Sequence, residues 1–344
     1  MDISDFDYEL PEELIAQVPL EERDASRMLV VDRKNHTWSD SHFSTFTQHL
    51  HSTDVVVINN TRVIPARLIG RRLPSGGRVE ILLVRELEPS IWEALVRPGA
   101  RLKPGSMVDF DKGKLTAEIL DEPGKELRHV KFYSEGAFGS ILEDIGLMPL
   151  PPYIKRASGV SSQDRERYQT IFSRNPGAIA APTAGLHFSP RLLDEVRVRA
   201  RLAEITLHVG YGTFEPVRVS DVRQHSVSAE RLQITEAAAQ LVNEAKNEGG
   251  RIIAIGTTTM RALESASTDL GRLLPGDRDA QLTITPGYFF RVADALLTNF
   301  HLPRSSLLLL VSAFAGRNLV LDAYRHAVKE RYRFYSYGDC MLIL

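Results

Sequence analysis

The chain has 344 residues, enough for a large core and for two domains, and its 43% hydrophobic and 25% charged content is that of an ordinary globular protein. Its single cysteine, Cys340, excludes an intrachain disulfide and a cysteine-rich zinc cluster. The 42 basic and 44 acidic residues give a net charge of −2, whereas a dedicated nucleic-acid binder usually carries a basic excess.

No segment has the pattern of a membrane anchor or a secretory signal. The longest apolar run, Leu307 to Ala313, is about ten residues shorter than a bilayer span. The opening residues, Met1 to Asp5, are acidic and lack an apolar stretch. We therefore expect a cytoplasmic protein with no membrane association and no obligate protein partner.

The first 62 residues have an α/β pattern. Pro11 to Ala16 predicts a short helix, with proline in the first turn. Met28 to Val31 and Asp54 to Asn59 predict buried strands, because they are apolar, rich in β-branched residues and bounded by polar ones.

The pattern changes after Arg62. Strand-length apolar stretches alternate with turns rich in glycine and proline, which is typical of a small antiparallel barrel or sandwich. The stretches are Val79 to Val84, Ile91 to Val96, Met107 to Phe110, Leu115 to Leu120 and Val130 to Tyr133. We predict an inserted β-barrel domain at residues 63–135, within a discontinuous α/β catalytic domain made of residues 1–62 and 136–344.

The α/β pattern returns in the remainder of the chain. A long polar segment, Lys155 to Pro176, is predicted to be an irregular, functional loop. The other predicted elements are helices at 138–147, 190–202, 236–246, 258–266 and 319–332, a strand at 251–255 and a buried segment at 307–313.

No common cofactor motif is complete. Gly210 to Glu215 has two glycines of a dinucleotide-binding fingerprint but lacks the third, and no Walker A lysine or zinc-protease motif is present. Polar residues instead follow predicted strands, where ligands of open α/β sheets bind. Gly256 to Thr258 opens a helix whose N–H groups suit a carboxylate or phosphate. On that helix Arg261 and Glu264 share a face, and a surface ion pair is the simpler interpretation.

Three histidines, His187, His208 and His301, lie in polar or glycine-rich junctions. A single histidine is more often a hydrogen-bonded core residue than a catalyst, but three in such junctions favour a site. A run of basic residues has two interpretations, a solvated face or a local phosphate-contacting strip. It comprises Arg62, Arg67, Arg71, Arg72, Arg78, Arg97, Arg101 and Lys103. The residues alone thus indicate an α/β enzyme with an anionic or nucleoside-like ligand.

Long segments resemble the S-adenosylmethionine:tRNA ribosyltransferase-isomerase family, in order, from about residue 2 to the end. They include Leu10 to Gln17, Arg23 to Arg27, Asn59 to Leu68, Ala180 to Phe188, Leu207 to Phe214, Gly256 to Ser265, Pro286 to Tyr288, Asp294 to Pro303 and Tyr335 to Asp339. The family fold is an α/β domain with an inserted small β-barrel, in agreement with the change of pattern after Arg62.

The resemblance implies that S-adenosylmethionine acts as a co-substrate that donates its ribosyl carbons, with no metal expected. The acceptor is 7-aminomethyl-7-deazaguanine at the wobble position of tRNAs with a GUN anticodon, those for Asp, Asn, His and Tyr. The product is epoxyqueuosine, and adenine and methionine are released.

The chemistry requires a base beside the sulfonium and an acid for adenine departure. His187, His208 and His301 are the candidates, with the two roles unassigned. The tRNA substrate is expected to contact Asp24, Arg27, Arg67, Arg71 and Arg72. The S-adenosylmethionine site is expected to use Asn59, Arg62, Thr183, Gly210, Gly212, Thr213, Glu215, Thr257, Thr258, Arg261, Asp294, Asn299 and Tyr337.

One position departs from the family pattern. After His225 the family usually has a second histidine three residues on, where this chain has Ser228, ahead of Glu230. His225 and Glu230 are therefore only weaker site candidates. The departure favours an alternative, an inactive RNA-binding protein on the same scaffold. A second alternative, suited to the neutral charge, is an S-adenosylmethionine-dependent enzyme acting on a free nucleoside.

Overall fold

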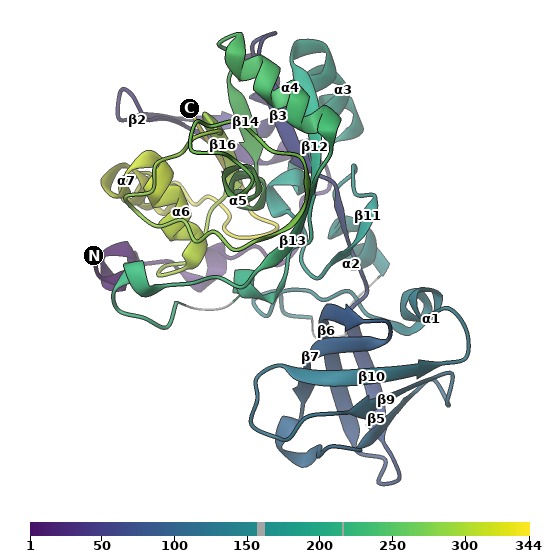
Figure 1. Cartoon of the computed structure of the whole chain (residues 1–344). Helices are drawn as coiled ribbons and strands as arrows, with labels where there is room; N and C mark the ends of the chain where they lie inside the picture. The colour runs from purple at the N-terminus through teal and green to yellow at the C-terminus, as the bar shows by residue number, and fades with distance from the viewer. Residues whose placement is uncertain (157–161, 215–216) are drawn as a thin grey trace.

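The computed structural model describes residues 1–156, 162–214 and 217–344. It has two parts, a large mixed β-sheet with helices on both faces and a closed six-stranded β-barrel at one end of the molecule (Figure 1). The predicted fold class, an α/β domain with an inserted antiparallel barrel, is confirmed.

Nine strands form the large sheet in the order β15-β13-β12-β3-β14-β16-β17-β1-β2. Its centre, β12-β3-β14-β16, is parallel, and the outer strands are mostly antiparallel. The strands are β1 (Arg27–Asp32), β2 (Thr37–His42), β3 (Val55–Asn59), β12 (Arg201–Leu207), β13 (Glu230–Ile234), β14 (Ile252–Ile255), β15 (Gly276–Ala280), β16 (Ala295–Asn299) and β17 (Cys340–Ile343).

The centre of the sheet is covered on both faces, as a parallel sheet requires. On β3, Val55 and Val57 belong to one core, and Val56 and Ile58 to the other. The 3-10 helix η4 (Phe43–His49) and helix α3 (Pro190–Arg199) cover the second face. The first face is covered by α4 (Glu236–Asn247), α5 (Thr257–Ser265), α6 (Ser306–Ala315) and α7 (Arg317–Lys329).

The barrel has its own core, and every neighbouring pair of its strands is antiparallel. Gly70 allows this packing, because a Cβ there would lie 2.6 Å from the Phe110 ring. All six strands fall inside residues 63–135, and the exact division of the chain stays a prediction. They are β5 (Arg67–Arg72), β6 (Arg78–Glu88), β7 (Ile91–Arg97), β8 (Met107–Phe110), β9 (Leu115–Ile119) and β10 (Arg128–Ser134).

Three local predictions need correction. The helix predicted at Pro11 to Ala16 is only a 3-10 turn, η2 (Glu12–Leu14). The helix predicted to continue to residue 202 ends at Arg199, because β12 begins two residues later and pairs with β3. The Lys155 to Pro176 segment is not wholly irregular, since it contains α2 (Ser162–Arg167), although residues 157–161 lie outside the described part.

The remaining elements connect the two parts. Two short parallel strands form a separate sheet, β4 (Thr61–Val63) and β11 (Asn175–Ala178), and α1 (Phe138–Ile145) leads back from the barrel. The other 3-10 helices are η1 (Ile3–Phe6), η3 (Arg23–Ala25), η5 (Gly99–Arg101), η6 (Thr183–His187), η7 (Tyr211–Phe214) and η8 (Val222–Gln224). Among the described helices none is by itself long and apolar enough to cross a membrane; α6 and α7 reach that length only together, across a 115° bend.

Candidate active site

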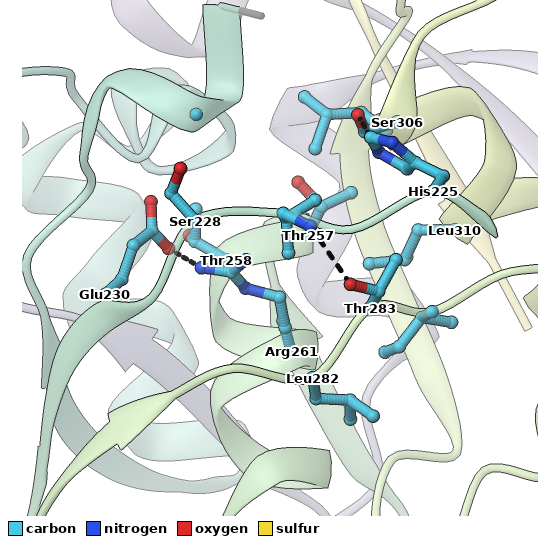
Figure 2. Close-up of a pocket in the computed structure, with 14 residues that line it drawn as sticks. His225, Ser228, Glu230, Thr257, Thr258, Arg261, Leu282, Thr283, Ser306 and Leu310 are labelled. Carbon is cyan, nitrogen blue, oxygen red and sulfur yellow. Dashed lines mark hydrogen bonds and ion pairs between the residues drawn. The ribbon is translucent and has the colours of Figure 1, made fainter. Parts of the chain in front are cut away.

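Two adjoining cavities meet at the N-terminus of α5, beyond the carboxyl end of β14. Thr257 and Thr258 line both. The first cavity, about 40 Å³, is otherwise lined by residues that include His225, Ser228, Glu230 and Arg261 (Figure 2). The second cavity, about 70 Å³, is otherwise lined by residues that include Tyr153, Tyr168, Thr183, Asn299, His301, Tyr335 and Ser336.

The N-terminus of α5 is open toward these cavities. Its N-cap, Gly256, has φ 93°, a conformation that a residue with a Cβ rarely adopts, and it offers no side-chain cap. The Thr258 hydroxyl is buried and has no hydrogen-bond partner among the described residues. The N–H groups that begin a helix, the positive end of the helix dipole and a hydroxyl without a partner in the described part of the chain together suit an anionic group.

Arg261 lies one turn along the same helix and forms a buried ion pair with Glu230 of β13 (Figure 2). Burial lowers the pKa of Arg261 to about 10, so the guanidinium remains charged near neutral pH. The other oxygen of Glu230 accepts a hydrogen bond from the Gly210 N–H at 2.8 Å. The first cavity therefore has one positive and one negative group side by side.

The surface ion pair expected between Arg261 and Glu264 is not present. Both side chains are buried, and Arg261 pairs with Glu230 instead. Glu264 accepts hydrogen bonds from Tyr288 and from three successive backbone N–H groups, residues 291–293. Arg261 and Glu264 do share a face of α5, but each is paired with residues that are distant in the sequence.

His225 and Ser228 complete the first cavity. The His225 Nε2 and the Ser306 hydroxyl share a hydrogen bond at 2.7 Å, which ties η8 to the start of α6. Burial lowers the pKa of His225 below its ordinary value. Ser228 lies beside Gly212, where a Cβ would approach the Ser228 Cβ to 3.3 Å. The structure thus brings both of the weaker candidates, His225 and Glu230, into the cavity.

His301 lines the second cavity. Its Nε2 shares a hydrogen bond with the Thr298 hydroxyl at 2.8 Å, and its Nδ1 has no hydrogen-bond partner among the described residues. Burial lowers its pKa to about 3, so the imidazole is neutral at pH 7. Asn299 lies beside it, with a buried Oδ1 that has no partner within the described chain. The cavity thus presents an unprotonated base and an unpaired acceptor.

His187 lies behind the second cavity, in a smaller one of about 20 Å³ that Tyr337 and Ser336 also line. Its Nε2 is 3.2 Å from the Asn299 amide nitrogen, and its Nδ1 is 2.9 Å from the Ser26 hydroxyl. Because that amide nitrogen also donates to the Tyr335 carbonyl, Nε2 is the acceptor. Burial lowers the pKa of His187 to about 3. Both of its ring nitrogens are therefore engaged by the protein.

His208 lines neither cavity. It packs against Gly177, and its Nδ1 shares a hydrogen bond with the Thr61 hydroxyl at 2.8 Å. Side chains alternate in direction along the extended chain that continues from β12, so the side chain of Val209 faces the second cavity and that of His208 points away from it. The structure therefore separates His208 from the cavity that His301 and Asn299 line and from His187, which is hydrogen-bonded to Asn299.

Several predicted cofactor contacts have structural partners away from the cavities. Asn59 joins β3 to β12 through both backbone groups of Leu207. Asp294 accepts from the Ile252 N–H, at the opposite end of β14 from Gly256. Arg62 is exposed on β4. Gly212 lines the first cavity, Thr213 lies on η7, and Glu215 lies outside the described residues.

The predicted tRNA contacts are dispersed. Asp24 binds Ser189 and Arg191, and Arg27 stacks on Tyr332 at 3.7 Å. Arg67 faces a large cavity beside the barrel and pairs with Glu80. Arg71 and Arg72 lie at the other end of β5, near the turn that follows it.

The tyrosines of the second cavity were not predicted. Tyr153 and Tyr335 pack edge to face at 3.9 Å, and Tyr153 shares a hydrogen bond with Ser336 at 2.6 Å. Burial raises the pKa of Tyr153, Tyr168 and Tyr335, so their hydroxyls keep their protons. The Tyr335-Ser336-Tyr337 motif was the one sequence signal for this wall.

Within the described residues no group of three acidic, histidine or cysteine side chains is arranged to hold a metal ion.

The fold is that of an α/β protein with cavities at the carboxyl end of its central strands, where enzymes of this class bind their ligands. A family model described as queuosine biosynthesis protein matches residues 3–343. A protein of Pelotomaculum thermopropionicum is 51% identical over the full length of both chains, and one of Natranaerobius thermophilus is 48% identical over all of this chain and 99% of its own. Both are named S-adenosylmethionine:tRNA ribosyltransferase-isomerase.

A solved structure supports the same assignment. The crystal structure of S-adenosylmethionine tRNA ribosyltransferase from Thermotoga maritima is 37% identical, with a TM-score of 0.55 over 99% of this chain and all of that one. The chain belongs to the S-adenosylmethionine:tRNA ribosyltransferase-isomerase family of queuosine biosynthesis, and it is a transferase of that class. The predicted family is confirmed.

Proposed function

We propose that this enzyme transfers the ribosyl carbons of S-adenosylmethionine to 7-aminomethyl-7-deazaguanine at the wobble position of GUN tRNAs and isomerises them. The products would be epoxyqueuosine, adenine and methionine. The observation that carries the proposal is the pair of adjoining cavities at the N-terminus of α5, in a chain of this family. A tRNA substrate is consistent with a cytoplasmic enzyme.

The first cavity fits the amino-acid end of the co-substrate. A methionyl group carries a carboxylate and an ammonium, and this cavity pairs Arg261 and the α5 N-terminus with Glu230. The unpaired Thr258 hydroxyl is available to the carboxylate. The cavities together are much smaller than the roughly 300 Å³ of common ligand pockets, so we expect their walls to move apart on binding.

The second cavity fits the nucleoside end. The unpaired Asn299 Oδ1 can accept from a ribose hydroxyl or from the adenine amino group. A neutral His301 is suited to remove the proton from the carbon beside the sulfonium. The tyrosine hydroxyls that line this cavity carry protons and are further candidates to donate a hydrogen bond as adenine leaves.

Among the three predicted catalytic histidines, this geometry favours His301 as the base. His187 would orient Asn299, and His208 would hold the end of β12 to β4 through Thr61. His301→Gln should lower turnover by about two to four orders of magnitude, and His208→Gln by much less. A larger loss in His208→Gln than in His301→Gln would contradict this assignment.

The reaction is tested by incubating the enzyme with S-adenosylmethionine and tRNA carrying the modified base, and analysing the nucleosides by mass spectrometry. Epoxyqueuosine with released adenine is the expected result. The same assay with the free modified nucleoside tests the small-substrate alternative. Binding of tRNA without product would favour the inactive RNA-binding alternative and direct attention to Ser228.

A further inference from the structure

A large cavity, about 630 Å³, lies between the barrel and the α/β domain. The barrel side is the outer face of β6 and β7, because alternate residues of these strands point inward to the barrel core. The outward residues are Arg78, Glu80, Leu82, Leu95 and Arg97. The opposite wall is a proline-rich segment, residues 149–152, with Ile154, Arg156, Ile179 and Tyr211.

The charge of this cavity is positive, because four arginines and one glutamate line it. Two of the arginines are neutralised, Arg67 by Glu80 and Arg156 by Asp164. Arg78 and Arg97 are exposed, and within the described part of the chain neither forms an ion pair or a side-chain hydrogen bond. An enzyme with a net charge of −2 thus presents two uncompensated guanidiniums in one concave surface.

The arginine-lined cavity backs directly onto the candidate active site. Ile154 lines it, while the preceding residue, Tyr153, lines the second cavity. Ile179 lines it, and the next residue, Ala180, lines the second cavity. Tyr211 lines it, and the next residue, Gly212, lines the first cavity. Three separate segments therefore form a shared wall, so a chain held in the large cavity would lie across this wall from the candidate active site.

We propose that this cavity holds the phosphate backbone of the tRNA anticodon loop, through Arg78 and Arg97, while the wobble base enters the active site. The inference rests on the proposed function. Guanidinium groups bind phosphate oxygens in a forked geometry, and a cavity of this volume accommodates a nucleotide unit. The position also gives the inserted barrel a role, since it supplies one wall of the RNA site.

The test compares three double variants for binding to a GUN-anticodon tRNA over a range of salt concentrations. Arg78→Ala/Arg97→Ala should weaken binding by about tenfold for each arginine. The slope of log Kd against log salt should fall by about 0.7 for each phosphate that is no longer neutralised. Arg78→Lys/Arg97→Lys keeps the charge and should retain most of the slope. Arg85→Ala/Lys125→Ala removes two exposed barrel cations outside the cavity and should bind within about twofold of wild type.

Stabilisation by S-adenosylmethionine, measured as a shift in Tm, should be the same in all variants and shows that each is folded. Wild-type tRNA affinity and slope in Arg78→Ala/Arg97→Ala would overturn the proposal, even if wild-type enzyme makes epoxyqueuosine. Selective loss of tRNA binding in that variant would support the cavity, even if the wild-type product assay failed. The cavity and the reaction are therefore tested separately.

Discussion

At the scale of single residues, we propose that the buried Glu230–Arg261 pair combines a structural and a binding role. Each single substitution leaves a buried charge without its partner, which typically costs about 3–5 kcal/mol, whereas an apolar or neutral replacement of both is often tolerated. Burial of the pair is nearly complete, so solvent screens it little. Comparison of the single and double substitutions therefore distinguishes the effect of the pair on stability from its effect on ligand binding.

We expect Glu230→Gln and Arg261→Met each to lower the free energy of unfolding by several kcal/mol, and the double variant to recover most of that loss. The double variant should nevertheless bind S-adenosylmethionine poorly, since it has lost both of the charges that we expect to contact the methionyl group. Urea unfolding and ligand titration measure the two effects. Wild-type affinity in the double variant would exclude this pair from the binding site.

The neutral His301 gives a pH prediction. Its pKa is about 3 in the folded protein and about 6.5 in the unfolded chain. The unfolded state binds the extra proton, so this contribution to stability is present above pH 6.5 and is lost as the pH falls toward 3. The loss is about 1.4 kcal/mol per pH unit for one imidazole. In His301→Asn the slope of unfolding free energy between pH 6 and 4.5 should decrease by about that amount; an unchanged slope would mean that His301 is not held neutral by burial.

At the scale of elements, the N-terminus of α5 depends on Gly256 and Thr258. Thr258→Val keeps the shape of the side chain but removes the unpaired hydroxyl. Because that hydroxyl has no protein partner among the described residues, stability should stay within about 0.5 kcal/mol or rise. Affinity for S-adenosylmethionine should fall about tenfold.

Thr259→Val is the comparison. The Thr259 hydroxyl donates a hydrogen bond to the Ile255 carbonyl, so its loss should lower stability and leave the affinity unchanged. Equal affinity in Thr258→Val and wild type would remove this helix end from the site.

Elements with a strong local pattern were predictable. The apolar run of β3, the barrel strands β6 to β10 between glycine and proline turns, and the glycine that opens α5 each carry their signal in adjacent residues, whereas the arginine-rich β5 was not predicted. β15 could not be found this way, because Gly276–Ala280 is mostly charged and becomes a strand only by pairing with β13. Arg261 and Glu230 are 31 positions apart in sequence, so their contact depends on β13 lying beside α5. Motifs predicted several of the residues that line the cavities, such as His301 and Thr258, whereas their partners required the fold.

At the scale of the whole molecule, the two parts have different tasks. The sheet carries the two cavities that we propose for the co-substrate, and the barrel adds an arginine-bearing wall beside them. A protein with near-zero net charge can bind RNA if its cations are concentrated where the phosphates lie. We therefore expect salt-sensitive tRNA binding that is independent of S-adenosylmethionine binding.

The proposed reaction is tested by nucleoside mass spectrometry after incubation of the enzyme with S-adenosylmethionine and tRNA carrying 7-aminomethyl-7-deazaguanine. We expect epoxyqueuosine in the tRNA and one adenine released for each epoxyqueuosine formed. Unchanged modified base, from folded enzyme that binds both substrates, would contradict the proposed reaction.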